Sequence, residues 1–217
     1  MTDRPVIRRA EHRDIDGIVA VKSRLSMPRE EEATSTGGFL LGSSRDWYEA
    51  FVDQAFFHVL EDPERGVVGF AIALGDELMR SGEIWGRRSE VEWLEDVSQA
   101  DAGRVAYFEQ LAILPERPYR LYAPSLALAP YRDLIQTGHT HLFATVVRKP
   151  IHNKAAIPLL TGIGARLVGR IEEEYDGVGR LVSDIYMVCI DRPSSDDPVE
   201  NTPLGGKVRS IFSRLAE

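Results

Sequence analysis

Apolar residues recur along this chain at two spacings, one typical of strands and one typical of helices. Short apolar runs predict strands at 6–10, 56–60, 67–74, 105–114, 141–147, 166–172 and 181–190. Spacing of three to four residues predicts helices at 14–22, 44–52, 125–136 and 153–162, and we expect Pro130 to kink or divide the third of them. The order predicts an α/β fold with a mixed sheet and helices on both faces.

Three segments depart from this pattern. Residues 27–36 carry Pro28 and three consecutive glutamates and are expected to be an exposed loop or a broken helix. Residues 75–103 hold two tryptophans and no clear strand, which is typical of a lid or of an exposed helical insertion. Residues 191–205 have the composition of a linker, and residues 206–217 predict an amphipathic helix. We therefore expect one domain over 1–190 and a terminal helix that docks on it or on a second subunit of a homodimer.

Composition narrows the class of protein. The formal charge of −8 over 217 residues argues against nucleic-acid binding through an overall positive field. The single cysteine, Cys189, excludes an intramolecular disulfide and a cysteine-rich zinc site. No signal-peptide pattern and no apolar run long enough for a membrane span are present, so we expect a cytoplasmic protein without membrane contact.

Several local motifs appear in a telling order. Residues 7–18 read as a strand and helix, Gly66–Phe70 as a later strand, and 107–116 as a strand that ends in Pro115. Residues 153–167 contain Asn-Lys-Ala-Ala and then Gly-Ala-Arg-Leu. Together these segments resemble the GCN5-related N-acetyltransferase (GNAT) superfamily over roughly residues 5–190. No single motif is diagnostic, and the order carries the resemblance.

The resemblance implies a mostly antiparallel sheet of six or seven strands and an acyl transfer from acetyl-CoA, or another acyl-CoA, to a primary amine. In that family the strand before the proline separates from its neighbour, and the thioester arm lies along its bare backbone. The corresponding residues here are Leu111, Ala112 and Ile113. The acceptor is expected to be a small molecule or a peptide or protein amine, and no metal is implied.

The loop that would hold the diphosphate differs from the family pattern. The three positions that are usually Gln or Arg, Gly, and Gly or Ala are Pro118, Leu121 and Ala123. Pro124 also removes one backbone donor, while Arg117 and Arg120 supply positive charge. The resemblance assigns this loop, with Tyr122, to the coenzyme. We therefore expect weaker coenzyme binding, an acyl carrier protein as donor, or binding chiefly through the pantetheine arm.

The chemistry requires a base and an acid. Glu109 is the base candidate, because it lies among apolar neighbours and should share a face with Ile113; the alternative is an ion pair with Arg104 or Arg148. The family's acidic tyrosine is replaced by Leu160. Either Tyr122, Tyr175 or Tyr186 takes its place, or the thiolate leaves without an acid.

Other candidate residues have two readings. By resemblance Asn153 and Ala156 contact the coenzyme, but Asn153 may equally cap the helix that follows. Phe39 and Trp85 are candidates for the wall of the acceptor pocket, or for core positions. His152 is expected to be an exposed loop residue, and His139 and His141 lack a third metal ligand. The glutamates at 30–32 and 172–174 are either solvated or form an acidic mouth that attracts an amine.

The sequence therefore predicts a GNAT-like N-acyltransferase that works by direct attack of the amine on the thioester. The alternative keeps the fold without amine transfer. In that case the domain would bind an acyl thioester, an acyl carrier or a protein partner, or would use the thioester in a hydrolytic or decarboxylating reaction.

Overall fold

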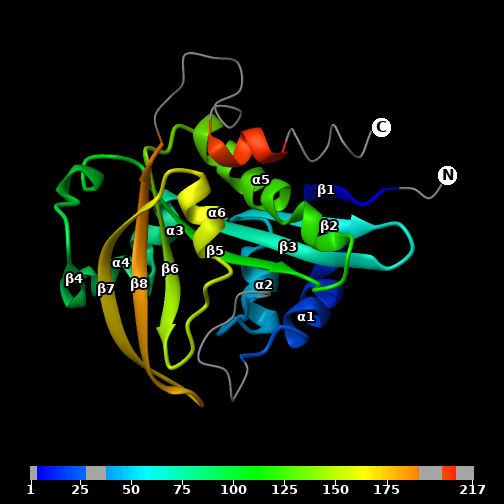
Figure 1. Cartoon of the computed structure of the whole chain (residues 1–217), viewed down its shortest axis with the longest axis horizontal. Helices are drawn as coiled ribbons and strands as arrows, with labels where there is room; N and C mark the ends of the chain where they lie inside the picture. Colours follow the sequence, from blue (N-terminus) through cyan, green and yellow to red (C-terminus); the bar gives the residue numbers. More distant parts are fainter. Residues whose placement is uncertain (1–3, 28–37, 191–201, 209–217) are drawn as a thin grey trace.

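Eight strands form one sheet in the computed structural model, which describes residues 4–27, 38–190 and 202–208 (Figure 1). The strand order is β1-β2-β3-β5-β6-β8-β7-β4, and only β5 and β6 pair in parallel. The strands are β1 (Val6–Arg9), β2 (Phe56–Asp62), β3 (Gly66–Leu74), β4 (Glu92–Trp93), β5 (Val105–Ile113), β6 (His141–Lys149), β7 (Arg166–Tyr175) and β8 (Gly179–Cys189).

The predicted mostly antiparallel α/β architecture is confirmed, with one strand more than expected. The additional strand is β4, a two-residue edge strand that pairs with β7 at Gly169 and Arg170. It lies in the 75–103 segment, where no strand was predicted. Two residues are too few to show an alternating pattern, so only the pairing partner reveals it.

Six α-helices and four short 3₁₀ helices accompany the sheet in the described part of the chain. They are α1 (Ile15–Ser23), α2 (Arg45–Phe51), α3 (Asp76–Ser81), α4 (Glu83–Gly86), α5 (Ala123–Gln136) and α6 (Ile157–Gly162), with 3₁₀ helices at His12–Asp14, Arg87–Glu90, Ser98–Ala100 and Tyr119–Tyr122. Residues 203–208 are also helical.

Local sequence accounts for several of these boundaries. The Ser44 hydroxyl accepts a hydrogen bond from the Trp47 amide at 3.2 Å and begins α2, as predicted. Gly138, with φ of 77°, follows α5 in the left-handed conformation that glycine adopts without strain. Pro130 lies inside α5, which continues on both sides of it, so the helix is not divided, and a kink, the other predicted outcome, stays a prediction. Burial of Leu126 and Leu134 stabilises the helix despite the missing hydrogen bond.

The helix near Asn153 is shorter than predicted. It begins at Ile157, and Ala156 is its N-cap residue. Asn153 lies outside the helix and does not cap it, so the capping interpretation is wrong. The Pro at the second helical position fits the observed start, because the first turn does not use that amide.

The two faces of the sheet carry different helices. Phe70 of β3 packs edge-on against Tyr48 of α2, whereas a side chain on the next residue, Gly69, would meet Leu126 of α5. We call the first side, covered by α1, α2 and the 75–103 segment, the α2 face, and the second side, covered by α5 and α6, the α5 face (Figure 1). Neighbouring residues of a strand point to opposite faces, so β3 is covered on both sides as predicted.

Several expectations fall outside the described residues: the 28–36 loop with its glutamates, most of the 191–205 linker, and the last part of the terminal helix. The helical residues 203–208 pack on the α5 face, where Leu204 is buried beside Gly162. In the part of the chain that is described, no helix combines the length and the apolar character that a membrane crossing needs.

Candidate active site

Strands β5 and β6 separate part of the way along their length. They pair in parallel from Val105 with His141 to Phe108 with Ala144, and no pairing follows between the rest of β5 and β6. Both strands continue, β5 to Ile113 and β6 to Lys149, and their arrows point away from one another (Figure 1). We call this divergence the fork and the Phe108–Ala144 rung its vertex.

The register of β5 on β3 shows which backbone groups face the fork. The Leu114 amide donates to the Val68 carbonyl at 2.9 Å, and hydrogen-bonded pairs alternate along an antiparallel ladder. Ala112 therefore directs its amide and carbonyl toward Phe70 of β3, whereas Leu111 and Ile113 direct theirs toward the fork. Of the three residues assigned to the thioester arm, two offer free backbone groups and Ala112 does not.

A β-bulge in β5 changes the face on which Glu109 lies. Ile72 pairs with Gln110 and Ala73 pairs with Phe108, so Glu109 is an extra residue opposite β3. Gln110 contacts Tyr48 on the α2 face, while Ile113 lies beside Gly69 on the α5 face. The prediction that Glu109 shares the face of Ile113 is therefore wrong, because simple alternation does not hold across a bulge.

Glu109 is a half-buried carboxyl group among tyrosines on the α2 face. Its charge raises the pKa values of Tyr48, Tyr107 and Tyr175, so all three lie within its electrostatic reach. Removal from water raises the pKa of Glu109 to about 7, although a hydrogen bond with the Gln110 side chain acts in the opposite direction. The carboxyl group is thus poised to take up a proton near neutral pH.

The alternative reading of Glu109, an ion pair with a nearby arginine, does not match the contacts. Arg148 approaches Asp184 at 3.4 Å, and Arg104 donates to the Thr137 carbonyl at 2.5 Å. Among the described residues, no lysine or arginine forms an ion pair with Glu109. Its charge is therefore not neutralised by either partner that the sequence suggested.

A strained loop supports the residue next to Glu109. Tyr48 donates its hydroxyl to Gln110 Oε1 at 2.7 Å, and Gln110 Nε2 donates to Ser43 Oγ at 2.7 Å. Ser43 has φ of 53°, the only non-glycine residue in the described segments with such a backbone. Backbone strain of this kind persists where surrounding contacts hold it, and here it positions the Gln110 amide.

The segment between β5 and α5, assigned to the diphosphate, is a 3₁₀ helix at Tyr119–Tyr122. The Leu121 amide donates to the Pro118 carbonyl, and the Ala123 amide to the Arg120 carbonyl. Such amides are not available to an anion, which fits the departure from the glycine-rich pattern.

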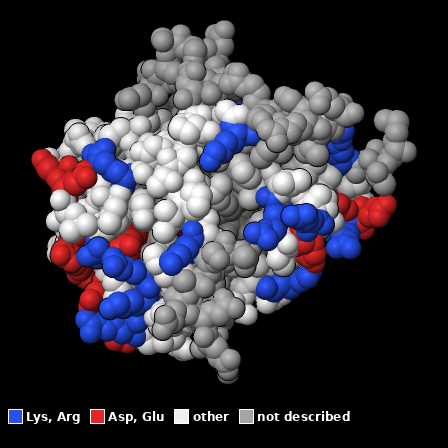
Figure 2. Space-filling view, in the orientation of Figure 1, with Lys and Arg blue, Asp and Glu red and all other residues white. Residues whose placement is uncertain are grey.

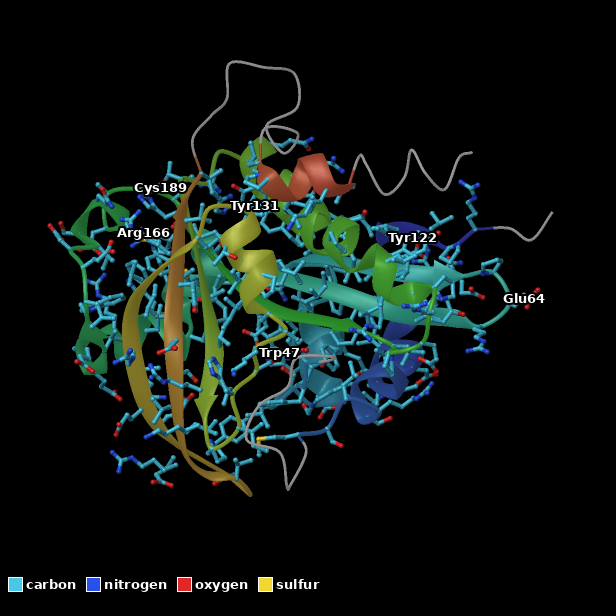
Figure 3. The ribbon with its side chains drawn as sticks, in the orientation of Figure 1. Trp47, Glu64, Tyr122, Tyr131, Arg166 and Cys189 are labelled. Atoms are coloured by element: carbon cyan, nitrogen blue, oxygen red, sulfur yellow. The ribbon has the colours of Figure 1, made fainter. Side chains whose placement is uncertain are left out.

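Side chains near this segment differ in their exposure to solvent. Arg117, Arg120 and Leu121 are exposed, and Tyr122 is buried at the start of α5 (Figure 3). Ser125 Oγ, in the first turn of α5, is buried without a hydrogen-bond partner among the described residues. Lysine and arginine side chains also stand out on the molecular face that carries α5 and α6 (Figure 2). The segment thus offers side-chain donors and positive charge in place of backbone amides.

The chain before α6 lies at the other arm of the fork. The Asn153 amide donates to the Val147 carbonyl of β6 at 2.9 Å, and its side chain contacts the Phe39 carbonyl at 3.4 Å. Ala156 is half-buried at the helix start. His152 is half-buried too, and its Nε2 has no partner in the described ranges, so the prediction of an exposed histidine is wrong. Burial follows from its place between β6 and α6, which spacing alone does not reveal.

The three candidate tyrosines occupy different positions. Tyr186 on β8 pairs with Ala144 at the vertex and belongs to the same apolar cluster on the α5 face as Leu160. Tyr175, at the end of β7, is in reach of Glu109, and Tyr122 packs before α5. Burial raises the pKa of Tyr186. Tyr186 is therefore the tyrosine that pairs at the vertex, and it shares an apolar cluster with Leu160.

Two remaining candidates have clear surroundings. Cys189 ends β8 opposite His141, at the closed end of the β5–β6 pair and about 10 Å from the vertex at the usual strand rise (Figure 3). His139 accepts a hydrogen bond from the Asp76 amide at 3.2 Å. Among the described residues, no three His, Cys, Asp or Glu side chains gather as they would around a metal ion.

A cavity of about 550 Å³ opens on the α2 face beside the vertex. Its floor includes Tyr107, Phe143 and Thr145, and the Tyr107 and Thr145 hydroxyls lie 2.5 Å apart. The 75–103 segment provides the opposite wall, which includes Trp85. Phe39, the other residue predicted to wall an acceptor pocket, is buried beside Asn153 and does not line this cavity.

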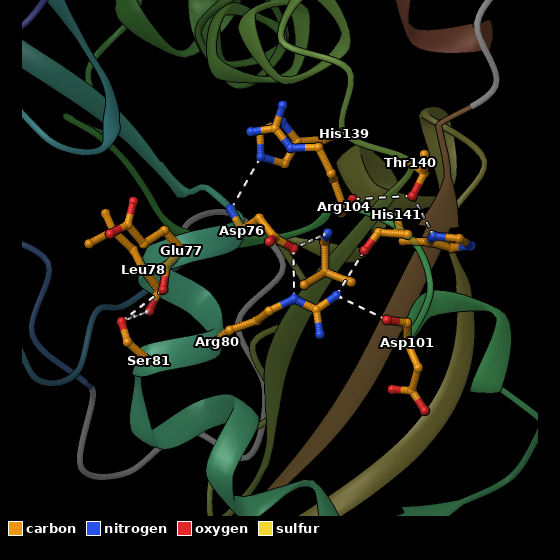
Figure 4. A network of polar contacts seen from close by, with 12 residues as sticks. Asp76, Glu77, Leu78, Arg80, Ser81, Asp101, Arg104, His139, Thr140 and His141 are labelled. Atoms are coloured by element: carbon orange, nitrogen blue, oxygen red, sulfur yellow. Dashed lines mark hydrogen bonds and ion pairs between the residues drawn. The ribbon is translucent and has the colours of Figure 1, made fainter.

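Hydrogen bonds, which Figure 4 shows, hold the 75–103 segment to the sheet, and a ring contact between Trp85 and Phe143 adds to them. Asp76 accepts from the Val105 amide at 2.8 Å and from Arg80 at 2.9 Å, and Arg80 also donates to the Gly103 carbonyl. The guanidinium groups of Arg80 and Arg88 each lie 4.6 Å from the centre of the Trp85 ring. The segment is thus an anchored wall with helical turns, closer to the predicted helical insertion than to a loose lid.

Four residues near the site were not correctly predicted from the sequence: Tyr107, Thr145, Ser125 and His152. Tyr107 and Thr145 carry no motif, and only the parallel pairing of β5 and β6 brings them together. Ser125 stands two residues after Ala123, the last position of the loop assigned to the coenzyme, and that proximity is a signal that could have found it.

Comparison with known proteins gives a structural answer only. No protein-family model and no curated protein sequence matches the chain. Among solved structures, the NatC complex bound to Gag peptide and CoA is similar with a TM-score of 0.58 and 13% identity, covering 87% of this chain and 100% of that one. The ribosomal-protein-S18-alanine N-acetyltransferase from Escherichia coli follows at 0.56 and 14%, covering 89% and 98%.

A GNAT superfamily phosphinothricin acetyltransferase from Sinorhizobium meliloti, in complex with AcCoA, has a TM-score of 0.55 and 14% identity, covering 93% of this chain and 96% of that one. These likenesses extend over most of each chain at identities too low to carry a substrate across. TM-scores of 0.55 to 0.58 over 87–93% of this chain show a common fold. The chain therefore has the fold of the GCN5-related N-acetyltransferases.

Proposed function

We propose that this protein is an acyl-CoA-dependent N-acyltransferase that moves an acyl group, with acetyl as the expected group, to a primary amine. The observation that carries the proposal is the fork, where Leu111 and Ile113 turn backbone amides and carbonyls toward a gap that β6 leaves open. A pantetheine arm contains two amides, so it can pair with such an edge as a further strand would.

The reaction would cross the sheet at the vertex. The acyl thioester lies between the strand arms, and the amine approaches from the α2 face, where Glu109 lies. As the nitrogen forms a bond to the carbonyl carbon, the amine loses a proton to Glu109, directly or through a water. Cleavage of the carbon–sulfur bond then releases a thiolate on the α5 face.

Tyr186 is our candidate for the acid that protonates this thiolate, because it pairs at the vertex and shares an apolar cluster with Leu160. Its phenol group, on β8, would take the role that the family resemblance assigns to a tyrosine at the Leu160 position of α6. The distance of Cys189 from the vertex supports direct attack by the amine without an acyl-cysteine intermediate.

The donor side is compatible with coenzyme A held in an unusual way. Arg117 and Arg120 supply charge for the diphosphate, and Ser125 Oγ and His152 Nε2 are buried polar atoms that need partners. A protein left with such groups gains hydrogen bonds when a polar ligand arrives. The residues present therefore fit the arm and diphosphate of the donor.

The alternative, binding of a thioester or carrier without amine transfer, is favoured by the 3₁₀ turn at Tyr119–Tyr122, which consumes amides that a diphosphate would use. An acyl carrier protein as donor would also tolerate this loop. A cytoplasmic location and a homodimer remain predictions of the sequence.

Amide hydrogen exchange tests donor binding at the fork. Acetyl-CoA should slow exchange of the Leu111 and Ile113 amides at least about tenfold, because both gain partners. The Ala112 amide, already paired with β3, is the internal control and should not change. A parallel assay should detect amine-dependent thiol release and the acylated amine by mass. Unchanged exchange at both residues would refute the fork as donor site, and binding without any product would favour the alternative.

A further inference from the structure

We infer that the cavity between the sheet and the 75–103 segment binds the acceptor, and that the acceptor is a small primary amine carried on an apolar body the size of an aromatic ring. This inference rests on the proposed function for its reaction and on the cavity alone for its ligand class.

The position of the cavity ties it to the vertex. Its floor is made by Tyr107 and Phe143, which pair one rung before the vertex, and by Thr145, the first residue of β6 beyond it. A ligand on this floor lies on the face where Glu109 raises the pKa of Tyr107. The amine would thus enter from the side opposite α5 and α6 and meet the acyl carbon where the strands part.

The walls select an apolar body. Apolar side chains from both walls line the space, among them Trp85, Val91, Val97, Phe143, Ile171 and Ile185. Phe143 and Trp85 meet edge to face with ring centres 6.5 Å apart. A volume of about 550 Å³ lies in the usual range of small-molecule sites, about 300–1,000 Å³. A purely hydrophilic amine would make no apolar contacts with these side chains.

The charges favour a cation at one end. Four carboxylates and two guanidinium groups line the cavity: Glu95, Asp96, Asp101, Glu173, Arg87 and Arg88. Arg87 is shared between Glu90 and Glu173, so Glu173 is only partly neutralised. Glu173 and Glu109 both raise the pKa of Tyr107, which places a second negative charge beside the reaction centre. Negative charge there attracts an ammonium group before it gives up its proton.

The walls are also fixed in place. Trp85 lies between the guanidinium groups of Arg80 and Arg88, and Arg88 pairs with Asp101 at 2.7 Å. A preformed apolar pocket binds its ligand without the cost of ordering a loop. The fixed walls therefore favour a cavity that selects acceptors by their shape, and not one that adapts its walls to many different acceptors.

The test compares three probes by calorimetry on the full chain, without any acyl donor. 2-Phenylethylamine has the apolar body and the charge, ethanolamine has the charge on a polar body, and 2-phenylethanol has the body without the charge. We expect 2-phenylethylamine to bind at least about tenfold more tightly than either of the others. Ethanolamine lacks the apolar contacts with the cavity, and 2-phenylethanol lacks the ionic ones.

A matched pair of variants locates the site. Ser98 lines the cavity and Gln99 does not, and both are exposed in the same 3₁₀ helix. Ser98→Trp should fill the mouth and weaken 2-phenylethylamine binding at least about tenfold, whereas Gln99→Trp should change it less than about twofold. Thermal unfolding of both variants controls for folding.

The outcomes separate the two proposals. Equal or tighter binding of ethanolamine, no binding of any probe, or no effect of Ser98→Trp would overturn the inference. If the protein acylates ethanolamine at a rate that Ser98→Trp does not change, the proposed function would hold and the inference about the cavity would fail. Binding of 2-phenylethylamine that Ser98→Trp abolishes, with no acyl transfer from acetyl-CoA, would support the pocket and refute the proposed function.

Discussion

The fork and the Pro115–Ser125 segment are two ends of one proposed donor groove, and they are built differently. The fork consists of backbone groups, and Leu111 and Ile113 serve it whatever their side chains are. The Pro115–Ser125 segment would need glycines and free amides, and it has a 3₁₀ turn with Leu121 in place of glycine. A site formed by the backbone groups of a strand tolerates side-chain substitution. A loop whose backbone must approach the ligand closely does not, because it depends on glycine.

We therefore expect the groups at the fork to contribute more to the reaction rate than the Pro115–Ser125 segment contributes through binding of the diphosphate. Three variants test this, and they should act in decreasing order from the vertex to the loop.

The largest effect is expected from Glu109→Gln. Loss of the base should lower kcat by about 10²-fold or more, within the range that general bases provide. The wild-type rate should rise with pH through about 7, as Glu109 loses its proton, and this limb should be absent from the variant. A pH–rate profile measures both. An unchanged kcat would mean that the fork works without this carboxyl group.

Glu109→Gln also has a predicted effect on stability. The folded-state pKa is raised above the ordinary glutamate value of 4.5, so the folded chain binds this proton more tightly than the unfolded chain between pH 4.5 and about 7. Ionised Glu109 therefore destabilises the fold as pH rises. The variant should melt at a higher temperature than the wild type at pH 8, and this difference should disappear as the pH falls below 4.5. A lower melting temperature at pH 8 would contradict the burial argument.

A smaller effect is expected from Tyr186→Phe. Removal of the proposed acid should lower kcat by about tenfold with acetyl-CoA, which is less than the usual acid–base contribution of about 10²–10⁴-fold, because a thiolate is a good leaving group. An aryl thioester donor, with a more acidic thiol, should show little difference. Tyr131→Phe, in the same apolar cluster, is the control and should change kcat less than about twofold. Equal effects of both variants would point to packing.

The smallest effect is expected from the double variant Arg117→Ala and Arg120→Ala. The exposed guanidinium groups should contribute modestly to a solvated diphosphate, so KM for acetyl-CoA should rise about fivefold with kcat unchanged. S-acetylpantetheine, which lacks the diphosphate, should react equally well with wild type and variant. A fall in kcat, or an equal loss with the truncated donor, would show that these arginines act elsewhere.

Patterns along the chain predicted the fold well. The central hairpin of β2 and β3, the capped start of α2 and the strand before Pro115 follow from period, turn chemistry and capping, which are local properties. The two-residue β4 and the late start of α6 escaped prediction because a pairing partner and a packing surface decide them.

The candidate site was predictable only in part. The spacing of Glu109 among apolar residues suggested a buried carboxyl group, and its raised pKa agrees with that reading. Its face was predicted wrongly, since one bulge residue reverses the alternation of a strand. Phe39 and Trp85 carried the same signal, yet only Trp85 lines the cavity.

The amino-acid order by itself determined which segments become strands and helices and which carboxyl group would be buried, because those outcomes depend on neighbours a few residues away. Tertiary structure alone decided where β5 leaves β6, which backbone amides stay free, and which side chains from β5, β6, β7 and the 75–103 segment enclose one cavity. Those outcomes depend on contacts between residues far apart in the chain, and no local pattern records them.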